Sequence, residues 1–172
     1  QGSGTETPPG MREKRREGRL LRRLDQLLTF GGTGRVLRKT SSWSQFDVFE
    51  LDAVSDGQCI TSLVLYYVRR HSLDYKLSLH VPNLVRFLSR LEKGYRDVPF
   101  HNKVHAADVV HATAYLMTQE RVRRLIQPLD LYSMLLAALR DFEGVQYAAW
   151  GQGVDEVSQQ KLKQPLLRRD PE

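Results

Sequence analysis

Three of the chain's five histidines fall in one stretch, PFHNKVHAADVVHATAYL, which spans residues 99–116. Successive helical residues turn by about 100°, so positions four and seven apart share a face. On a helix, His101, His105 and Asp108 would share such a face. Imidazole binds metals and donates protons near neutral pH, and a carboxylate one turn away can bind metal or orient the ring. His111 would point elsewhere, and we expect it to be an ordinary surface or core-edge residue.

Spacing alone leaves two interpretations of this stretch open. The first is a metal-dependent catalytic site, but such a site needs three or four convergent ligands and one helix readily supplies two. In the second, His101 begins a helix, His105 is an interior histidine with satisfied hydrogen bonds, and Asp108 bonds a neighbouring backbone group. Spacing by itself favours the second, structural interpretation.

The elements that would carry these residues are all predicted to be helices. Apolar residues recur at three- and four-residue spacing, and no segment shows the sustained alternation of a strand. The expected helices cover residues 11–29, 59 to about 71, 82–93, 102–117, and a last one from 121 or 128 to 139. We therefore expect an all-α fold.

The positive charge of the chain belongs to its N-terminal region. Residues 1–42 hold ten Lys/Arg and four Asp/Glu, whereas residues 43–172 hold sixteen of each, so the net charge of +6 lies in the first part. Residues 11–29 place leucines on one helical face and arginines on the other. This pattern is typical of a helix that binds an acidic membrane, nucleic acid or a partner groove, and also of a solvated helix leaning on the body. We favour the solvated helix.

Three glycines, Gly31, Gly32 and Gly34, are expected to form a flexible joint after this helix. Their spacing matches no phosphate-binding loop and no Lys-Ser/Thr pair follows them, so they carry no sign of nucleotide binding. We divide the chain into a basic, partly disordered arm and linker (residues 1–42), a helical body (43–143) and a divergent, irregular tail (144–172).

Length and composition are those of one globular domain with a core of its own. With 172 residues and 41% hydrophobic content, the chain has no apolar run that could cross a bilayer and no N-terminal signal pattern. Cys59 is the single cysteine, so a disulfide within the chain is excluded, which fits a reducing compartment. We expect a cytoplasmic location. Because the first residue is Gln1, we also expect a fragment or a processed product.

The longer sequence around the histidines resembles a known protein family. The stretch NLVRFLSRLEKGYRDVPFHNKVHAADVVHATAYL is similar to the opening helices of the class I 3′,5′-cyclic-nucleotide phosphodiesterase catalytic domain. That family carries a Tyr-His-Asn triplet followed by a histidine and Ala-Ala-Asp-Val. Here the text is FHN at residues 100–102 and HAADV at 105–109, and WSQFDVFELDAVSDGQ also resembles the entry to that domain. The similarity runs from about Trp43 to Ala138.

The resemblance implies an all-helical, HD-type two-metal phosphohydrolase that hydrolyses cAMP or cGMP to the 5′-monophosphate. It implies that His101 is the general acid that protonates the leaving ribose oxygen, and that His105 ligates the tighter-bound metal, usually zinc, with magnesium as the other ion. Two metals can hold a bridging hydroxide and neutralise the phosphate, and an imidazolium can protonate the departing oxygen.

The chain departs from the family pattern near residue 140. The family places a His-Asp pair there, and both members ligate metal. Asp141 is the candidate for the bridging aspartate, but Arg140 occupies the histidine's place, and a guanidinium would repel a cation. The later metal-binding aspartate, the purine-binding glutamine and the aromatic clamp of the family have no counterpart in this text, which leaves cAMP and cGMP undistinguished.

We therefore expect an incomplete, weakly active or inactive form of the phosphodiesterase. One alternative is a non-catalytic fragment that binds a full-length phosphodiesterase or its regulators, as a homo- or hetero-oligomer, through exposed helix faces. Another alternative is an adaptor whose basic arm binds a membrane or nucleic acid. From the sequence alone we do not expect such binding.

Overall fold

The computed structural model of the chain describes residues 9–139, and within them it contains helices and no strands. The expected all-α fold is confirmed. The elements are α1 (Pro9–Thr29), α2 (Gly31–Arg38), the 3-10 turn η1 (Lys39–Ser41), α3 (Val48–Val54), α4 (Cys59–Arg70), α5 (Leu73–Lys76), α6 (Val81–Lys93), α7 (Lys103–Met117), α8 (Glu120–Arg123) and α9 (Pro128–Ala137). The predicted tail, residues 144–172, lies outside the described part.

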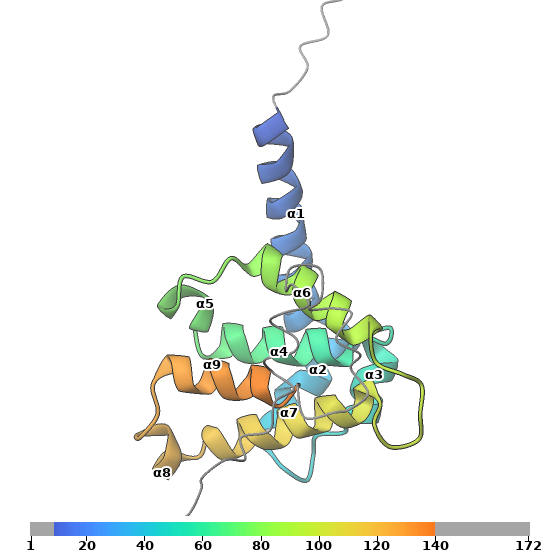
Figure 1. Cartoon of the computed structure of the whole chain (residues 1–172), viewed down its shortest axis with the longest axis vertical. Coiled ribbons are helices and arrows are strands. Elements are labelled where there is room, and N and C mark those ends of the chain that lie inside the picture. The colour runs from blue at the N-terminus through green and yellow to red at the C-terminus, as the bar shows by residue number, and fades with distance from the viewer. Residues whose placement is uncertain (1–8, 140–172) are drawn as a thin grey trace, which may run out of the picture.

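The centre of the body is α4, which packs against α6 on one side and α7 on the other (Figure 1). Its side chains are apolar nearly all round, and a helix of that kind is stable only inside a core. The buried residues of α4 are Cys59, Ile60, Thr61, Ser62, Leu63, Val64, Leu65, Tyr67 and Val68. In turn α7 packs against α9, so the helix that carries the histidine stretch lies between α4 and α9.

Helix starts follow the capping signals in the sequence. Asp47 caps α3 by accepting hydrogen bonds from the backbone N–H groups of Phe49 (2.8 Å) and Glu50 (3.2 Å). Pro82 lies in the first turn of α6, where its missing N–H costs least. The helices predicted over residues 82–93 and 102–117 are therefore confirmed, each to within a residue.

The prediction of a flexible joint at Gly31, Gly32 and Gly34 is wrong, because these glycines begin the helix α2. Gly31 has a φ of +71°, which lets the chain turn sharply between α1 and α2. At Gly34, a Cβ atom would lie 2.6 Å from the carbonyl carbon of Thr29. The glycine therefore permits close packing of two helices rather than flexibility.

The region after these glycines belongs to the core. Thr33, Val36 and Leu37 are buried, and α2 packs against α1, α3 and α4. Residues 31–41 thus do not form the linker expected from their composition. The division of the chain at residue 43 stays a prediction.

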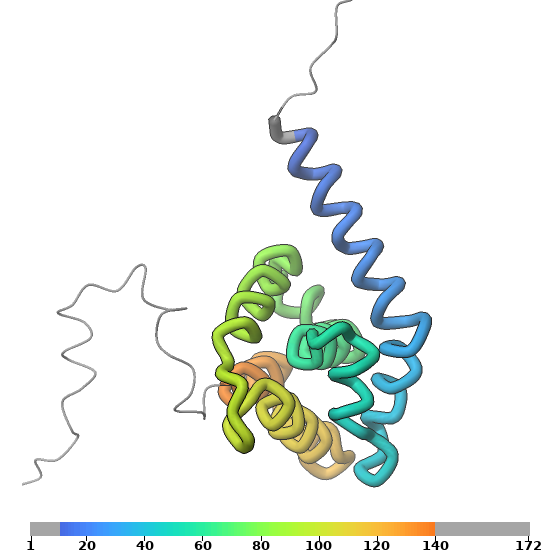
Figure 2. Tube along the Cα trace, turned by 90° about the vertical axis from the view of Figure 1, so that its right-hand side faces the viewer, coloured from blue at the N-terminus to red at the C-terminus, as the bar shows by residue number. Residues whose placement is uncertain are grey.

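The helix predicted over residues 11–29 is confirmed as α1, and it projects from the body along the long axis of the molecule (Figures 1 and 2). Its C-terminal half lies against α2, α4 and α6. None of the helices in residues 9–139 is long and apolar enough to span a membrane.

Candidate active site at the start of α7

The residues predicted to do chemistry lie at the N-terminus of α7. Asn102 is its N-cap, and the side-chain oxygen accepts a hydrogen bond from the backbone N–H of His105 at 3.0 Å. The amide nitrogen of Asn102 donates to the carbonyl oxygen of Val98 at 2.9 Å. One side chain therefore ties the preceding loop to the first turn of the helix and fixes His101 just outside it.

The rings of His101 and His105 lie edge to face, with centroids 6.3 Å apart and planes at 71°. Both side chains are exposed, and so is Asp108 one turn further along the helix. Both imidazoles thus lie within reach of one small molecule at the surface. The interior position expected for His105 under the structural interpretation is wrong.

The opposite face of α7 anchors this turn to the core. Ala106, Ala107 and Val110 are buried, and α7 makes its most extensive contact with α4. Small side chains at these positions let the two helices approach closely. The exposed and buried faces together set the direction in which the histidines point.

Lys103 holds the same turn to α3 and to the loop after it. Its ammonium lies 2.9 Å from Asp52 Oδ1 and donates to the carbonyl oxygen of Gly57 at 2.8 Å. Burial lowers the pKa of Lys103, but the hydrogen bond and negative charge of Asp52 outweigh that effect and the pKa is raised. Lys103 therefore stays charged at neutral pH and has a positioning role.

Two ionisable groups under this turn were missed by sequence reasoning. Cys59 is buried, and its thiol lies 3.8 Å from the carbonyl oxygen of Lys103. Burial and then the negative charge of Glu92 raise the pKa of Cys59, so the thiol is protonated and unreactive at neutral pH. No pattern in the sequence distinguishes this cysteine from an exposed one.

The second missed group is Glu92, a carboxylate with only 6% of its surface exposed. It accepts hydrogen bonds from the backbone N–H of Ile60 (2.7 Å), from the hydroxyl of Thr61 (2.6 Å) and from the backbone N–H of Thr61 (3.4 Å). Glu92 of α6 thus satisfies the free donors at the start of α4. Burial raises its pKa, although these hydrogen bonds act in the other direction.

His111 lies in the core rather than at the surface, with 3% of its area exposed. Its ring packs at 4.1 Å from that of Phe46 and stacks at 5.7 Å on Trp43. Its Nε2 lies 3.3 Å from the carbonyl oxygen of Thr40. Burial lowers the pKa of His111, so the ring is neutral at physiological pH and has a structural role.

A metal ion would need more ligands than this turn supplies. Residues 9–139 contain no group of three or more His, Cys, Asp or Glu side chains that could hold an ion. The remaining predicted ligand, Asp141, lies outside those residues. The described residues do not by themselves fit a metal centre.

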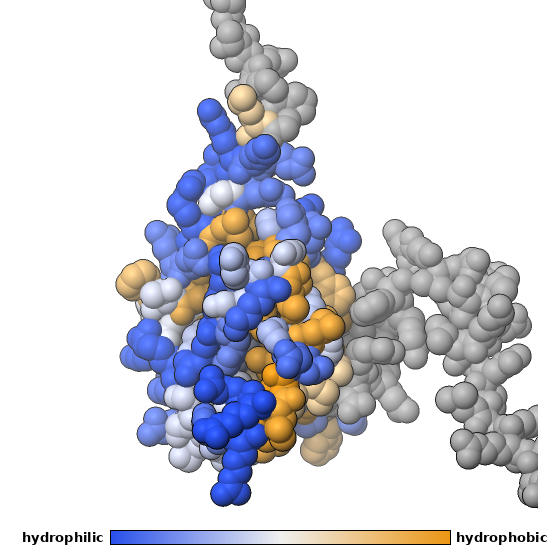
Figure 3. Space-filling view, turned by 90° about the vertical axis from the view of Figure 1, so that its left-hand side faces the viewer, coloured by the Kyte–Doolittle hydropathy of each residue, from blue (hydrophilic) through white to orange (hydrophobic). Residues whose placement is uncertain are grey.

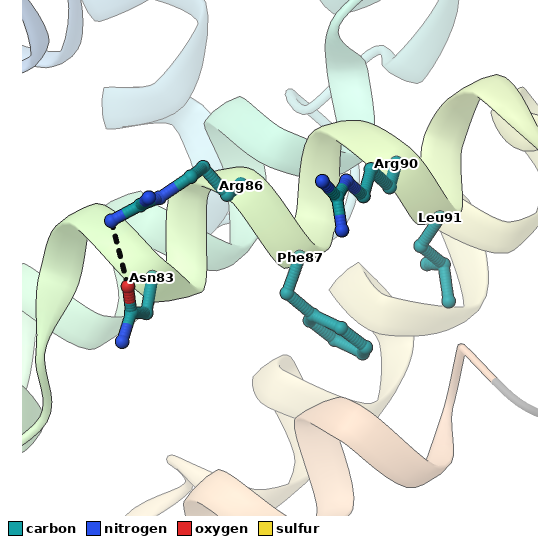
Figure 4. Close-up of a pocket in the computed structure, with 5 residues that line it drawn as sticks. All are labelled: Asn83, Arg86, Phe87, Arg90 and Leu91. Atoms are coloured by element: carbon teal, nitrogen blue, oxygen red, sulfur yellow. Dashed lines mark hydrogen bonds between the residues drawn. The ribbon is translucent and has the colours of Figure 1, made fainter. Parts of the chain in front are cut away.

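A separate hollow of about 300 Å³ lies on the surface of α6 (Figure 4). It is lined by Asn83, Arg86, Phe87, Arg90 and Leu91, and the guanidinium of Arg86 donates to Asn83 Oδ1 at 2.8 Å. Neither His101 nor His105 lines it, so it is not the candidate active site.

Comparison with known proteins identifies the histidine stretch. Residues 100–141 match the 3'5'-cyclic nucleotide phosphodiesterase family. The human high affinity cAMP-specific and IBMX-insensitive 3',5'-cyclic phosphodiesterase 8A is 33% identical over 105 residues, which are 60% of this chain and 12% of that protein. The 3',5'-cyclic-AMP phosphodiesterase 4 of Dictyostelium discoideum is 26% identical over 125 residues, 72% of this chain and 12% of that protein.

A mouse relative, the dual specificity calcium/calmodulin-dependent 3',5'-cyclic nucleotide phosphodiesterase 1C, is 31% identical over 111 residues, or 63% of this chain and 16% of the relative. The chain thus spans less than a fifth of the length of each of these three proteins. Residues 100–141 thus resemble a stretch of a phosphodiesterase. More specifically, they match the 3'5'-cyclic nucleotide phosphodiesterase family, and the three relatives extend the similarity to between 60% and 72% of this chain.

Proposed function

We propose that the start of α7 is one wall of a site that hydrolyses a 3′,5′-cyclic nucleotide, cAMP or cGMP, with His101 as proton donor and His105 as metal ligand. One observation carries this proposal: the family match over residues 100–141 contains both histidines, and the capped helix presents both rings on one exposed surface. An ordinary helix start would not require two histidine rings on one exposed surface.

The chemistry assigned to His101 follows from the leaving group. Hydrolysis breaks the bond between phosphorus and the ribose 3′ oxygen, and an alkoxide leaves slowly unless it receives a proton. An imidazolium fixed just before the N-cap of a rigid helix can deliver that proton, an effect worth about 10²–10⁴-fold in rate. Asn102 would act as a positioning residue, because it fixes the loop that carries His101.

The metal chemistry requires residues beyond those described. Divalent ions such as Zn²⁺ and Mg²⁺ would supply a hydroxide nucleophile and neutralise the phosphate. His105 offers one ligand and Asp141 is the proposed second, while Arg140 stands where the family has a histidine. With so few ligands we expect weak metal affinity, and therefore weak or absent turnover by this chain alone.

The direct test is hydrolysis of cAMP and cGMP by the purified chain with Zn²⁺ and Mg²⁺, beside the variants His101→Ala and His80→Ala. His80 is also an exposed histidine but lies before α6, so it is a matched control. We expect any measurable turnover to be lost in His101→Ala and kept in His80→Ala. Robust turnover that survives His101→Ala would refute the assigned role.

A second candidate function is binding to another phosphodiesterase without catalysis. Large apolar side chains are exposed around the end of α7 and along α9, and such patches commonly mark interfaces. They are Leu116 (60% exposed), Leu125 (83%), Leu129 (59%) and Met134 (43%). Sedimentation of the chain mixed with a purified phosphodiesterase catalytic domain tests this, since a Leu125→Asp, Leu129→Asp double variant should abolish any complex.

A further inference from the structure

The projecting helix α1 carries a dense set of exposed cations. Six of them surround its N-terminal and middle turns: Lys14, Arg15, Arg16, Arg19, Arg22 and Arg23. At about 100° per residue they cover an arc of about 200° around the helix axis. None of the six makes an ion pair with any residue of the described range 9–139.

Two of the three acidic side chains of α1, Glu17 and Asp25, are directed at the body instead, whereas the third, Glu13, is exposed. Glu17 Oε1 lies 3.6 Å from His80 Nε2 and 4.0 Å from Arg86 Nη2. Asp25 Oδ1 lies 3.1 Å from Arg69 Nη2. Glu13 can offset one of the six cations, so the outer face of α1 keeps a large excess of positive charge. It is also concentrated, because the remainder of the chain from residue 43 is neutral overall.

The apolar side of α1 is not available for a membrane. Leu28 is buried, and Leu21 and Leu24 pack against the core. Met11 is the one large apolar side chain exposed in the projecting half. A helix that lies in a bilayer surface needs its apolar face for insertion, and this helix already uses that face on the protein.

We propose that α1 binds double-stranded DNA by laying its exposed face in the major groove, with its arginines on the phosphates of both walls. A flat anionic surface meets only one side of a helix, whereas cations spread over about 200° can meet two opposed walls. A helix with side chains is about 10–12 Å across and the major groove of B-DNA is about 12 Å wide. Five of the six cations are arginines, whose planar guanidinium binds phosphate through two parallel hydrogen bonds.

Contacts to phosphate confer affinity without sequence specificity, and they predict a strong salt dependence. The test uses the full chain with a labelled 20-base-pair DNA duplex and an RNA duplex of the same sequence. Six phosphate contacts would lower the affinity by about 10³-fold between 50 and 200 mM salt. The RNA duplex is the comparison, because the major groove of A-form RNA is deep and narrow, and we expect the DNA duplex to bind more tightly.

The decisive variant is Arg15→Gln, Arg19→Gln, Arg22→Gln, since glutamine keeps the helix but removes three cations. Its matched control is Arg90→Gln, Arg96→Gln, Arg121→Gln, which removes the same charge from exposed positions on the body. We expect the first variant to lower the salt slope by about three and the control to leave it unchanged. Circular dichroism shows that each variant is folded.

Three results would overturn the proposal. One is the absence of binding to the DNA duplex at 50 mM salt, or binding to the RNA duplex that is at least as tight. Another is equal loss of affinity in the α1 variant and in the body control, which would indicate a non-specific effect of net charge. The third is tighter binding to phosphatidylserine vesicles than to either duplex, which would assign the helix to a membrane surface.

Discussion

At the scale of single residues, Asn102 matters as much as the histidines that it separates. Its side chain makes two hydrogen bonds in opposite directions, one to the first turn of α7 and one to the loop before it. The geometry of His101 and His105 therefore depends on a residue that does no chemistry. The family motif contains this asparagine, and the structure supplies a physical reason for it.

The variant Asn102→Ala should lower the free energy of unfolding by about 1 kcal/mol, the usual cost of a lost N-cap. Asn102→Asp keeps the oxygen that accepts from His105 but cannot donate to Val98, so it should lose less. Urea denaturation of the three chains measures the difference. Equal stability of Asn102→Ala and the original chain would contradict the capping role.

Glu92 predicts a pH dependence whose sign is fixed by its raised pKa. The folded chain holds the Glu92 proton more tightly than the unfolded chain, in which the carboxyl has its usual pKa near 4.5. The stability contributed by Glu92 is thus fully present below that pH and is lost as pH rises through the folded-state pKa. Relative to Glu92→Gln, which cannot titrate, the original chain should therefore lose stability from pH 4 upward.

Urea denaturation of both chains across this pH range provides the measurement, because all other titrating groups are common to both and cancel. A gain in the stability of the original chain relative to Glu92→Gln as pH rises would mean instead that the pKa of Glu92 is lowered in the folded chain. Glu92→Ala serves as a further comparison. It leaves three hydrogen-bond donors at the start of α4 without their acceptor and should cost about 1–3 kcal/mol or more.

At the scale of elements, helix existence and type could be predicted from the sequence, and helix contacts could not. Periodicity and proline position predicted α6 and α7 to within a residue. The role of Glu92 could not be predicted, because it depends on contact with residues 31 and 32 positions earlier in the chain. The exposure of His105 and the burial of His111 likewise depend on which face of α7 meets α4.

The glycine-rich segment shows why composition misled the prediction. Glycine permits flexibility, but it also permits close packing, and composition cannot distinguish the two. At Gly34 the neighbouring backbone shows that the glycine serves close packing, since the carbonyl oxygen of Thr29 would lie 2.7 Å from an added Cβ atom. Further along α2, Val36 and Leu37 are fully buried, so this helix belongs to the core.

Gly34→Ala should therefore destabilise the chain by about 1–3 kcal/mol, because the backbone of α1 must shift to make room. Gly18→Ala is the matched control, since its added Cβ would lie 3.9 Å from the flexible end of the Arg22 side chain. That change should stabilise α1 by about 0.5–1 kcal/mol. Thermal unfolding of both variants tests the contrast, and a neutral Gly34→Ala would mean that α1 and α2 are not closely packed.

At the scale of the whole molecule, chemistry and charge are separated. The candidate histidines lie on the body, whose sequence is neutral overall, whereas the set of six cations lies on α1, which projects away from it (Figure 2). One face of the body also gathers hydrophobic side chains among charged ones (Figure 3). These three surfaces can therefore be altered independently, so the proposals for catalysis, association and duplex binding are separable by mutation.

The central claim is that residues 43–138 correspond functionally to part of a cyclic-nucleotide phosphodiesterase catalytic domain. The most direct measurement replaces the equivalent segment of the mouse 1C relative with these residues and follows cAMP and cGMP hydrolysis by the chimera. We predict turnover that falls by about 10²–10⁴-fold in His101→Ala and is unchanged in His80→Ala. A folded chimera without turnover, or one whose turnover is indifferent to His101→Ala, would contradict the account.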